Sequence, residues 1–477
     1  MTPDEFRHAG HALVEWIAAY REQLAAGTLP VQAQVRPGDL LAALPATAPE
    51  HGEPFAAVLA DLDRLILPGI THWQHPRFFG YFPSGGSLTS VLGDMVSTGL
   101  GVIGLNWQAS PALTELEQVT TDWLRDLLGL PPAFSGVLQD TASAASFVAL
   151  VCARERATDY GAARAGLQSG GAPLVVYTSA QAHSSIEKAA LLAGFGRDHV
   201  RAIELDDEFR MHVPALEAAI RRDCAAGLVP CAVVATTGTT ATTAMDPIAS
   251  IAAVAGREGL WLHVDGAMGG AAMLLPECRH LWAGVEAADS IVVNPHKWLT
   301  IAFDCSLYLV RDPQHLVRVM STNPSYLQTP MDTQVRNYRD WGIPLGRRFR
   351  ALKIWMTLRD QGAEAIRARL RRDLANARWL AAEVDATPPW RRVAPLVLQT
   401  LCVRHEPAGM DAAALDAHTR RWTQAINDSG AAYLTPAVVA GRWVTRVSIG
   451  SALTEAVHVA ELWQAMRRAA DASAGAG

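Results

Sequence analysis

The sequence predicts an α/β fold in which a mostly parallel sheet is flanked by helices. Short apolar runs alternate with helical patterns through the central part of the chain, which is typical of a parallel sheet covered by helices. The 477 residues, half of them hydrophobic, suffice for two or three globular domains. Near residue 355 the pattern changes to long helices rich in Arg and Ala. We expect an N-terminal helical arm (residues 1–85), a large α/β domain (86–355) and a small α+β domain (356–477).

The arm is predicted to begin with a helix. Thr2-x-x-Glu5 is a capping-box pattern, and Pro3 stands at the first helical position. Apolar residues then recur at helical spacing: Leu13, Trp16, Ile17 and Tyr20. A proline-bearing stretch with little core of its own follows, so the apolar face must pack on the same chain or on a second subunit.

Apolar runs in the large domain predict its strands: Leu174–Tyr177, Cys231–Ala235, Leu260–Asp265, Ser290–Asn294 and Ser306–Val310. Helices are predicted between them, for example over Ala142–Arg156 and Pro247–Glu258. In the small domain, Leu396–Val403 and Trp443–Ser448 are predicted strands.

Composition excludes several classes of protein. With 41 basic and 47 acidic residues the net charge is −6, which argues against nucleic acid or an anionic membrane as a partner. The six cysteines form no CxxC pair and show no metal-ligand spacing. The N-terminus carries charged residues where a signal peptide needs an apolar core, and no apolar run reaches 18 residues. We expect a cytoplasmic protein without a metal.

A lysine follows the predicted strand Ser290–Asn294, within the segment Asn294–Trp298. A lysine on a loop is ordinarily solvated, but apolar residues follow this one, so its amine is expected near buried surface. Desolvation lowers the pKa of a lysine and yields the neutral amine that a Schiff base requires. Lys297 is therefore a candidate for bonding to a cofactor.

Other polar residues follow strands at the same predicted edge of the sheet. Asp265 closes an apolar strand, where it could instead cap the next element. A carboxylate and a lysine on either side of a flat cofactor meet the requirement of pyridoxal 5′-phosphate (PLP), whose pyridine nitrogen must stay protonated. The segment Asp140–Ser143 precedes a helix, whose free N–H groups favour a phosphate. His183 lies just beyond another strand.

The sequence resembles the PLP-dependent aromatic L-amino-acid decarboxylases, the group II decarboxylases of fold type I. The motifs run in the family's order along nearly the whole chain: HPRFFGYFP (75–83), NWQASPALTELE (106–117), AHSSIEKA (182–189), HVDGA (263–267), NPHKW (294–298) and IPLGRRFRALKIW (343–355).

The resemblance implies a role for each matching residue at the cofactor. Lys297 would hold PLP as a Schiff base with His296 beside it, Asp265 would pair with the pyridine nitrogen, and Ala267 would pack under the ring. His183 would stack on the opposite ring face. The remaining cofactor contacts would be Thr141, Ala142, Ser143, Thr240 and Asn294.

The resemblance also implies a substrate pocket and a proton donor. The pocket would be lined by Trp73, Tyr81, Phe82, Pro83, Ile103, Leu105 and Gly346. Leu105 replaces an aromatic residue of the animal enzymes, which widens the pocket. Gly346 stands where related histidine and plant tyrosine decarboxylases have serine, so it leaves room for a large ring. Tyr326, in the polar segment Ser321–Asp340, matches the tyrosine that protonates the substrate after CO2 leaves. Family members are homodimers whose N-terminal arms embrace the other subunit, so the resemblance implies that residues 1–85 form a dimerisation arm.

The expected reaction is decarboxylation of an aromatic L-amino acid (tryptophan, DOPA, tyrosine or phenylalanine) through a Schiff base and a quinonoid to an arylalkylamine. One alternative is an aromatic aldehyde synthase, which consumes oxygen on the same fold; the presence of Tyr326 argues against it. The other is a catalytically silent scaffold, against which Lys297, Asp265 and His183 argue.

Overall fold

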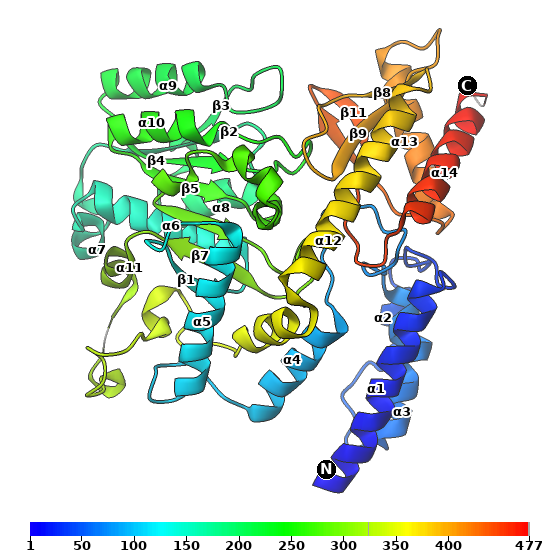
Figure 1. Cartoon of the computed structure of the whole chain (residues 1–477), viewed down its shortest axis with the longest axis horizontal. Helices are drawn as coiled ribbons and strands as arrows, with labels where there is room; N and C mark the ends of the chain where they lie inside the picture. Colours follow the sequence, from blue (N-terminus) through cyan, green and yellow to red (C-terminus); the bar gives the residue numbers. More distant parts are fainter. Residues whose placement is uncertain (323, 476–477) are drawn as a thin grey trace. The chain divides into compact units, whose positions relative to one another are not determined.

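The computed structural model describes residues 1–322 and 324–475, with the side chains of Ser169 and Tyr326 outside the described part. The chain divides into two compact units (Figure 1). Unit 1 comprises Met1–Pro83, Arg378–Val393 and Cys402–Gly477, and unit 2 comprises Ser84–Ala377 and Ala394–Leu401. The division into three parts at residues 85/86 and 355/356 stays a prediction.

Within the described residues, unit 2 is built on a seven-stranded sheet with the order β1-β7-β6-β5-β4-β2-β3. Its strands are β1 (Ser135–Gln139), β2 (Leu174–Ser179), β3 (Val200–Ile203), β4 (Val229–Thr236), β5 (Trp261–Asp265), β6 (Ser290–Val293) and β7 (Ser306–Val310). Neighbours from β6 to β3 pair in parallel, whereas β7 is antiparallel to both β6 and β1. The predicted α/β fold with a mostly parallel sheet is therefore confirmed.

Helices cover both faces of this sheet. Figure 1 shows α9 and α10 along one side and α6 along the other. The helices of unit 2 are α4 (Leu88–Leu100), α5 (Pro111–Leu128), α6 (Ala142–Ala157), α7 (Gly161–Ala165), α8 (Ser184–Leu192), α9 (Val213–Ala225), α10 (Ile248–Glu258), α11 (Pro313–Met320) and most of α12 (Ala351–Asp385). In α12, Gly362 has a positive φ of 73°, which divides the helix into two segments.

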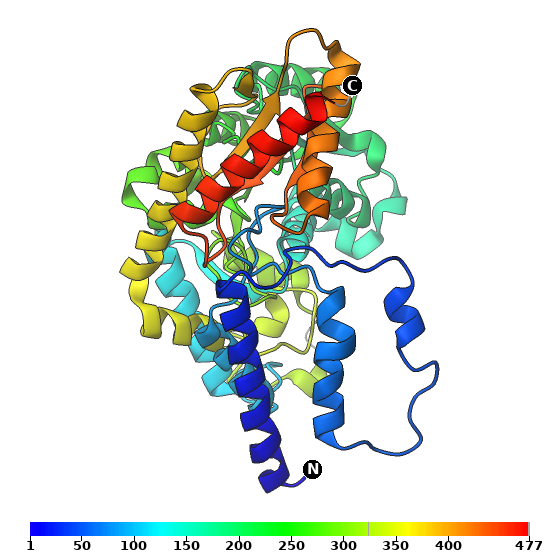
Figure 2. The same cartoon turned by 90° about the vertical axis from the view of Figure 1, so that its right-hand side faces the viewer.

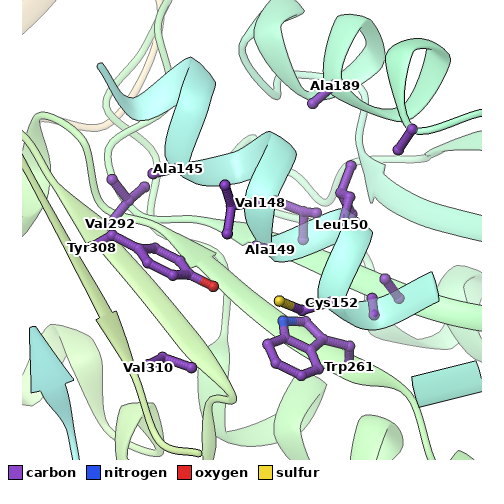
Figure 3. Packing of buried hydrophobic residues seen from close by; sticks show 14 of the residues in the cluster. Ala145, Val148, Ala149, Leu150, Cys152, Ala189, Trp261, Val292, Tyr308 and Val310 are labelled. Carbon is purple, nitrogen blue, oxygen red and sulfur yellow. The ribbon is translucent and has the colours of Figure 1, made fainter. Parts of the chain in front are cut away.

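The core of unit 2 forms where α6 lies on the sheet. Ala145 and Ala149 have no exposed surface, and their small side chains let the helix approach the strands closely (Figure 3). Larger side chains from the strands fill the space beside them, including Trp261 from β5 and Tyr308 from β7. A helix packed on this face holds its N-terminus at a fixed place relative to the strand ends.

One histidine is buried within the same core. His263 Nε2 lies 3.1 Å from Ser146 Oγ on α6, and its Nδ1 lies 2.9 Å from Ser290 Oγ on β6. Trp261 Nε1 donates to the same Ser290 hydroxyl at 3.0 Å. Burial lowers the pKa of His263 to about 4, so the folded protein holds this ring neutral.

We expect His263 to make the protein sensitive to acid. His263 binds a proton near pH 6.5 in the unfolded chain but only near pH 4 in the folded chain. The folded state is therefore favoured fully above pH 6.5, and its stability falls as the pH drops from 6.5 towards 4, because only the unfolded chain takes up the proton there. Between pH 7.5 and 5 the loss is about 2 kcal/mol. Urea unfolding of wild type and His263→Gln at both pH values measures it. The variant should be less stable at pH 7.5 but should depend less on pH; parallel pH profiles would contradict the assignment.

Unit 1 combines the N-terminal helices with a small sheet. The helices α1 (Pro3–Ala25) and α3 (Phe55–Asp61) lie side by side, with α2 (Asp39–Ala43) between them in sequence (Figure 2). The predicted capping box is confirmed, because Thr2 Oγ1 accepts from Glu5 N–H at 3.2 Å and Glu5 accepts from Thr2 N–H at 2.6 Å.

The small sheet has the order β10-β11-β9-β8 among the described residues. Its strands are β8 (Trp390–Arg392), β9 (Thr400–His405), β10 (Thr435–Val439) and β11 (Arg442–Ser448), accompanied by the helices α13 (Ala412–Asp428) and α14 (Ala456–Ala474). The predicted strand Leu396–Val403 was wrong at its start, because the chain turns after Val393 and pairs only from Thr400. None of the helices in residues 1–322 and 324–475 has the length and apolarity of a transmembrane segment.

Candidate active site

Parallel pairing brings the predicted cofactor residues to one edge of the sheet of unit 2. Asp265, the last residue of β5, lies opposite Val292 in β6 and Thr236 in β4. Asn294 directly follows β6, and His183 lies four residues beyond the end of β2. Because β1 is antiparallel to β7, which is antiparallel to β6, the carboxyl end of β1 lies at this edge too. Ligands of open α/β sheets bind at such an edge.

Lys297 stands in a tight turn after β6. Its N–H donates to Asn294 O at 3.0 Å, and its carbonyl accepts from Thr300 N–H at 3.1 Å. The residue keeps some exposed surface, yet burial of the amine lowers the pKa of Lys297, and the carboxylate of Asp265 opposes that shift. A lowered pKa leaves more of the amine neutral and nucleophilic at neutral pH.

Asp265 is buried beside this amine. Its Oδ1 accepts the backbone N–H of Ala267 at 3.0 Å, which fixes the carboxylate at the strand end. The same turn is tied to β6, because Asn294 N–H donates to Ala267 O at 3.0 Å and Asn294 Oδ1 accepts from Ser306 Oγ at 2.7 Å. Sequence reasoning missed Ser306, although its position at the start of β7 places it at this edge.

His183 presents an exposed ring at the N-terminus of α8. Its Nδ1 accepts from Ser185 N–H at 3.2 Å and lies 2.8 Å from Ser185 Oγ. Partial burial and the charge of Lys297 lower the pKa of His183, while Asp265 raises it. Because Nδ1 is an acceptor, the neutral ring carries its proton on Nε2. Ser185, which holds this orientation, was also missed.

The N-terminus of α6 provides a site for an anion. Thr141 is the N-cap residue, and its Oγ1 accepts from Ala144 N–H at 3.4 Å. Asp140 Oδ1 accepts from Thr141 N–H at 2.6 Å. Ala142 and Ser143 form the first turn, where N–H groups point away from the helix and the dipole favours negative charge. Thr240, another predicted cofactor contact, is an exposed residue in the mostly buried turn after β4.

His296 is fixed by the backbone around it. Its Nδ1 accepts from Cys305 N–H at 2.9 Å, and its ring meets Phe303 edge-on with 4.8 Å between centroids. Burial and the charge of Lys297 lower the pKa of His296 to about 4. The ring therefore stays neutral, and its Nδ1 already serves the backbone.

Two predicted pocket residues meet in unit 2. A Cβ placed on Gly346 would lie 3.4 Å from Ile103 Cγ2. The segment that carries Ile103 and Leu105 is bonded to the segment of Gly346, because Gly104 N–H donates to Arg347 O at 2.9 Å. We call residues 103–105 and 346–347 the pocket wall.

A buried ion pair anchors the pocket wall to β1. Arg347 Nη2 donates to Glu117 Oε1 at 2.5 Å and to Leu138 O at 2.7 Å, and Leu138 N–H donates to the same carboxylate oxygen at 2.8 Å. The guanidinium of Arg347 also lies over the ring of Tyr338, 5.0 Å from its centroid. Leu138 lies in β1, three residues before Thr141, so the strand that anchors the wall leads directly into the anion site.

Comparison with known proteins identifies the family. The model of the pyridoxal-dependent decarboxylase conserved domain matches residues 37–405. The chain is 40% identical over 486 residues to tyrosine decarboxylase 4 from Petroselinum crispum (99% of this chain, 94% of the relative), and 39% identical over 480 residues to phenylacetaldehyde synthase from Arabidopsis thaliana (98% and 96%). Oryza sativa TDC, crystallised with PLP and tryptamine, superposes with a TM-score of 0.95 at 35% identity (99% and 98%).

The chain belongs to the pyridoxal-dependent decarboxylases. Its cofactor is PLP, and the enzyme is a PLP-dependent carboxy-lyase. The groups at the sheet edge of this decarboxylase fit that cofactor: an amine of lowered pKa for the aldehyde, a buried carboxylate for the pyridine nitrogen, a helix N-terminus for the phosphate and an exposed imidazole for the ring face. Among the described residues, no group of three or more acidic, His or Cys side chains is arranged to hold a metal.

The other predicted pocket residues of this decarboxylase lie in unit 1. Trp73 stacks on Tyr81 with ring centroids 5.3 Å apart. Tyr81 N–H donates to Thr435 Oγ1 at 2.7 Å, and the ring of Phe82 lies 5.0 Å from the guanidinium of Arg446. Pro83 is the last residue of this part of unit 1. The predicted pocket residues are thus brought together within each unit.

In the described part of the segment Ser321–Asp340, Ser325–Leu327 forms a short 3-10 turn, and a second 3-10 turn, Tyr338–Trp341, begins near its end. Its described residues are attached near the ends: Leu327 O accepts from Arg339 Nη1 at 2.9 Å, and Asn337 Oδ1 accepts from Trp107 N–H at 3.0 Å. The predicted proton donor, the side chain of Tyr326, lies outside the described part.

Proposed function

We propose that this decarboxylase converts aromatic L-amino acids into the corresponding arylalkylamines and CO2. The observation that carries the proposal is the group of Lys297, Asp265 and His183 at the sheet edge, in a chain 40% identical over nearly its whole length to a tyrosine decarboxylase. Tryptophan, DOPA, tyrosine and phenylalanine are the candidate substrates. The protein is proposed to act in the cytoplasm, which its cysteine spacing supports, and without a nucleic-acid partner, which its mildly acidic charge supports.

The chemistry assigns a task to each of these three residues. PLP supplies a conjugated ring that accepts the electron pair left by the departing carboxylate. Lys297 would bind the cofactor's aldehyde carbon through its amine. Asp265 would keep the proton on the pyridine nitrogen, and loss of a buried partner charge costs about 3–5 kcal/mol. His183 would cover the ring face, and stacking alone contributes only about 0.5–1.5 kcal/mol.

The remaining residues would position the cofactor and the substrate. Thr141, Ala142 and Ser143 would bind the phosphate at the start of α6, where the helix dipole adds to the hydrogen bonds. Thr240, Ala267, Asn294 and His296 would complete the cofactor site. Trp73, Tyr81, Phe82, Pro83 and the pocket wall would contact the aromatic ring. Tyr326 would protonate the substrate carbon that has lost its carboxylate.

We further propose that the enzyme works as a homodimer. Support comes from apolar side chains that α4 leaves exposed in the single chain: Leu88, Leu92, Met95, Val96 and Leu100. Exposed apolar patches of this kind typically mark a protein interface. Ile103 of the pocket wall, 58% exposed, lies three residues beyond the end of this helix, so a second subunit would close the pocket.

The test of the proposed function is a panel of amino acids assayed for CO2 and amine. Aromatic L-amino acids should release both in equal amounts, whereas glutamate and histidine should release little. A preference for a non-aromatic amino acid would overturn the proposed substrate class and leave the family assignment intact.

Replacing Gly346 by serine should change the choice among aromatic substrates. The new Cβ would touch Ile103 Cγ2, and the hydroxyl beyond it would occupy space that a large ring needs. Changes of this size in a pocket alter discrimination by about 1–3 kcal/mol. We expect kcat/KM to fall more for tryptophan than for tyrosine. An equal fall for both would reject this description of the pocket.

The relatives also include a phenylacetaldehyde synthase, so aldehyde formation on the same fold is the second candidate function. The presence of Tyr326 favours amine formation. Measuring the products distinguishes the two functions. The Tyr326→Phe variant described in the Discussion tests whether Tyr326 determines which product forms.

A further inference from the structure

Helix α12 holds Trp298, the residue that follows Lys297, at two points. The indole Nε1 donates to Asp373 Oδ2 at 2.9 Å, and the backbone carbonyl accepts from Arg369 Nη2 at 2.8 Å. Trp298 and Asp373 have no exposed surface. Because Arg369 and Asp373 are four residues apart in a helix, both side chains leave the same face.

The charges on this face are buried at a cost. Two arginines of α12 lie near the carboxylate of Asp373, with Arg369 Nη1 at 3.8 Å and Arg372 Nη2 at 3.6 Å. Burial raises the pKa of Asp373 to about 6, and the two arginines oppose the shift. Apolar residues of similar volume often stabilise a fold as well as such a cluster does. A contribution to stability is therefore a weak explanation for these charges.

We propose that Arg369 and Asp373 are positioning residues for the amine of Lys297. The inference rests on the proposed function, in which Lys297 bonds to PLP. Trp298 is fixed on its side-chain and carbonyl sides by α12, while Lys297 is fixed by its own turn bonds to Asn294 and Thr300. The backbone on both sides of the lysine Cα is thus restrained.

The restraint matters because a lysine side chain is long and flexible. Its four-carbon stem can place the amine over a wide volume unless the direction of Cα–Cβ is set. Reactions at fixed groups are sensitive to displacements of about 1 Å, which can cost roughly 10²-fold in rate. Helix α12 thus restricts the direction of the Lys297 side chain from outside the cofactor site. It does so through Trp298, which need not touch PLP.

The experiment compares PLP with pyridoxamine phosphate, which lacks the aldehyde and cannot bond to lysine. Apo forms of wild type, Trp298→Phe, Asp373→Leu and the double variant are mixed with PLP, and visible absorbance follows its capture by Lys297. Pyridoxamine phosphate binding is measured by quenching of tryptophan fluorescence. Trp298→Phe removes the indole N–H together with part of a fully buried ring. Asp373→Leu and Asp373→Asn leave the indole intact, so the three variants together separate loss of the hydrogen bond from loss of ring volume.

We expect each single variant to capture PLP about tenfold more slowly, since it loses one hydrogen bond to a charged group. The double variant should be no slower than the single variants, and pyridoxamine phosphate should bind all of them as it binds wild type. Asp373→Asn, whose amide oxygen can still accept the indole N–H, should recover most of the rate. The matched control is Arg371→Ala, which removes an exposed arginine of α12 and its ion pair with Glu277, and this variant should match wild type.

Two results would overturn the proposal: unchanged PLP capture in Trp298→Phe, or equal losses of PLP and pyridoxamine phosphate, which would indicate general damage to the site. Neither readout uses an amino acid. A wild type that captures PLP but decarboxylates no aromatic substrate would therefore refute the proposed function alone.

Discussion

Replacing Lys297 by alanine is expected to abolish decarboxylation while PLP still binds through non-covalent contacts. The variant loses the amine that bonds to the cofactor and that can exchange protons with the substrate, and acid–base groups of this kind contribute about 10²–10⁴-fold. The phosphate site at α6 and the carboxylate of Asp265 remain. Turnover with each aromatic amino acid and the content of bound PLP are the two measurements.

The sequence makes the covalent test unusually clean, since it contains only three lysines: Lys188, Lys297 and Lys353. Lys353 is fully buried and donates to Asp94 at 3.1 Å, and Lys188 is exposed on α8. Borohydride should fix PLP to the peptide of Lys297 in wild type and to none in Lys297→Ala. Lys188→Arg is the control and should label and turn over normally. Label on Lys188 or Lys353 in wild type, or normal turnover by Lys297→Ala, would contradict the assignment.

Removing one oxygen atom from Tyr326 is expected to change the product. A phenol has a pKa near 10, so it is protonated at neutral pH and can donate to the substrate carbon that has lost CO2. Without that donor the electron-rich carbon persists, and molecular oxygen can take its electrons. The products then become aldehyde, CO2, ammonia and hydrogen peroxide. Tyr326→Phe should lose most amine formation, keep PLP and gain oxygen uptake.

A second tyrosine in the same segment provides the control. Tyr338 is buried against Trp341 and under Arg347, so Tyr338→Phe removes a hydroxyl from the same region without removing the proposed donor. That variant should still form amine. Amine, aldehyde and oxygen are measured side by side for both variants. Unchanged amine and no aldehyde from Tyr326→Phe would show that another group protonates the substrate.

The centre of the sheet was predictable because its strands are covered on both faces. Such strands appear as continuous apolar runs, and β4, β5 and β6 were located this way. Strand β1 was missed because Ser135, Gly136 and Gln139 interrupt its apolar run, and β3 is only four residues long. The antiparallel direction of β7 leaves no mark on the sequence, since an apolar run has the same composition in either direction.

The sequence predicts those residues of the candidate site that directly follow a strand. Asp265 and Lys297 could be recognised because each follows an apolar run, and parallel pairing then implies a common edge. Sequence reasoning could not identify Ser306, Ser185 and Asp373. Each of them acts by binding another side chain, and the sequence does not show which side chain that is. Trp298 and Asp373 are separated by 75 residues, and only the folded chain reveals that they touch.

In the proposed function, the pocket wall would allow substrate range to evolve separately from the catalytic chemistry. Residues 103–105 and 346–347 belong to segments that lie outside the strand ends, and the wall is attached through Arg347 to Glu117 and to the backbone of β1. A mutation at Ile103, Leu105 or Gly346 reshapes the wall without removing Lys297, Asp265 or His183. Selection can therefore sample new amines in small steps while each intermediate protein still loads its cofactor.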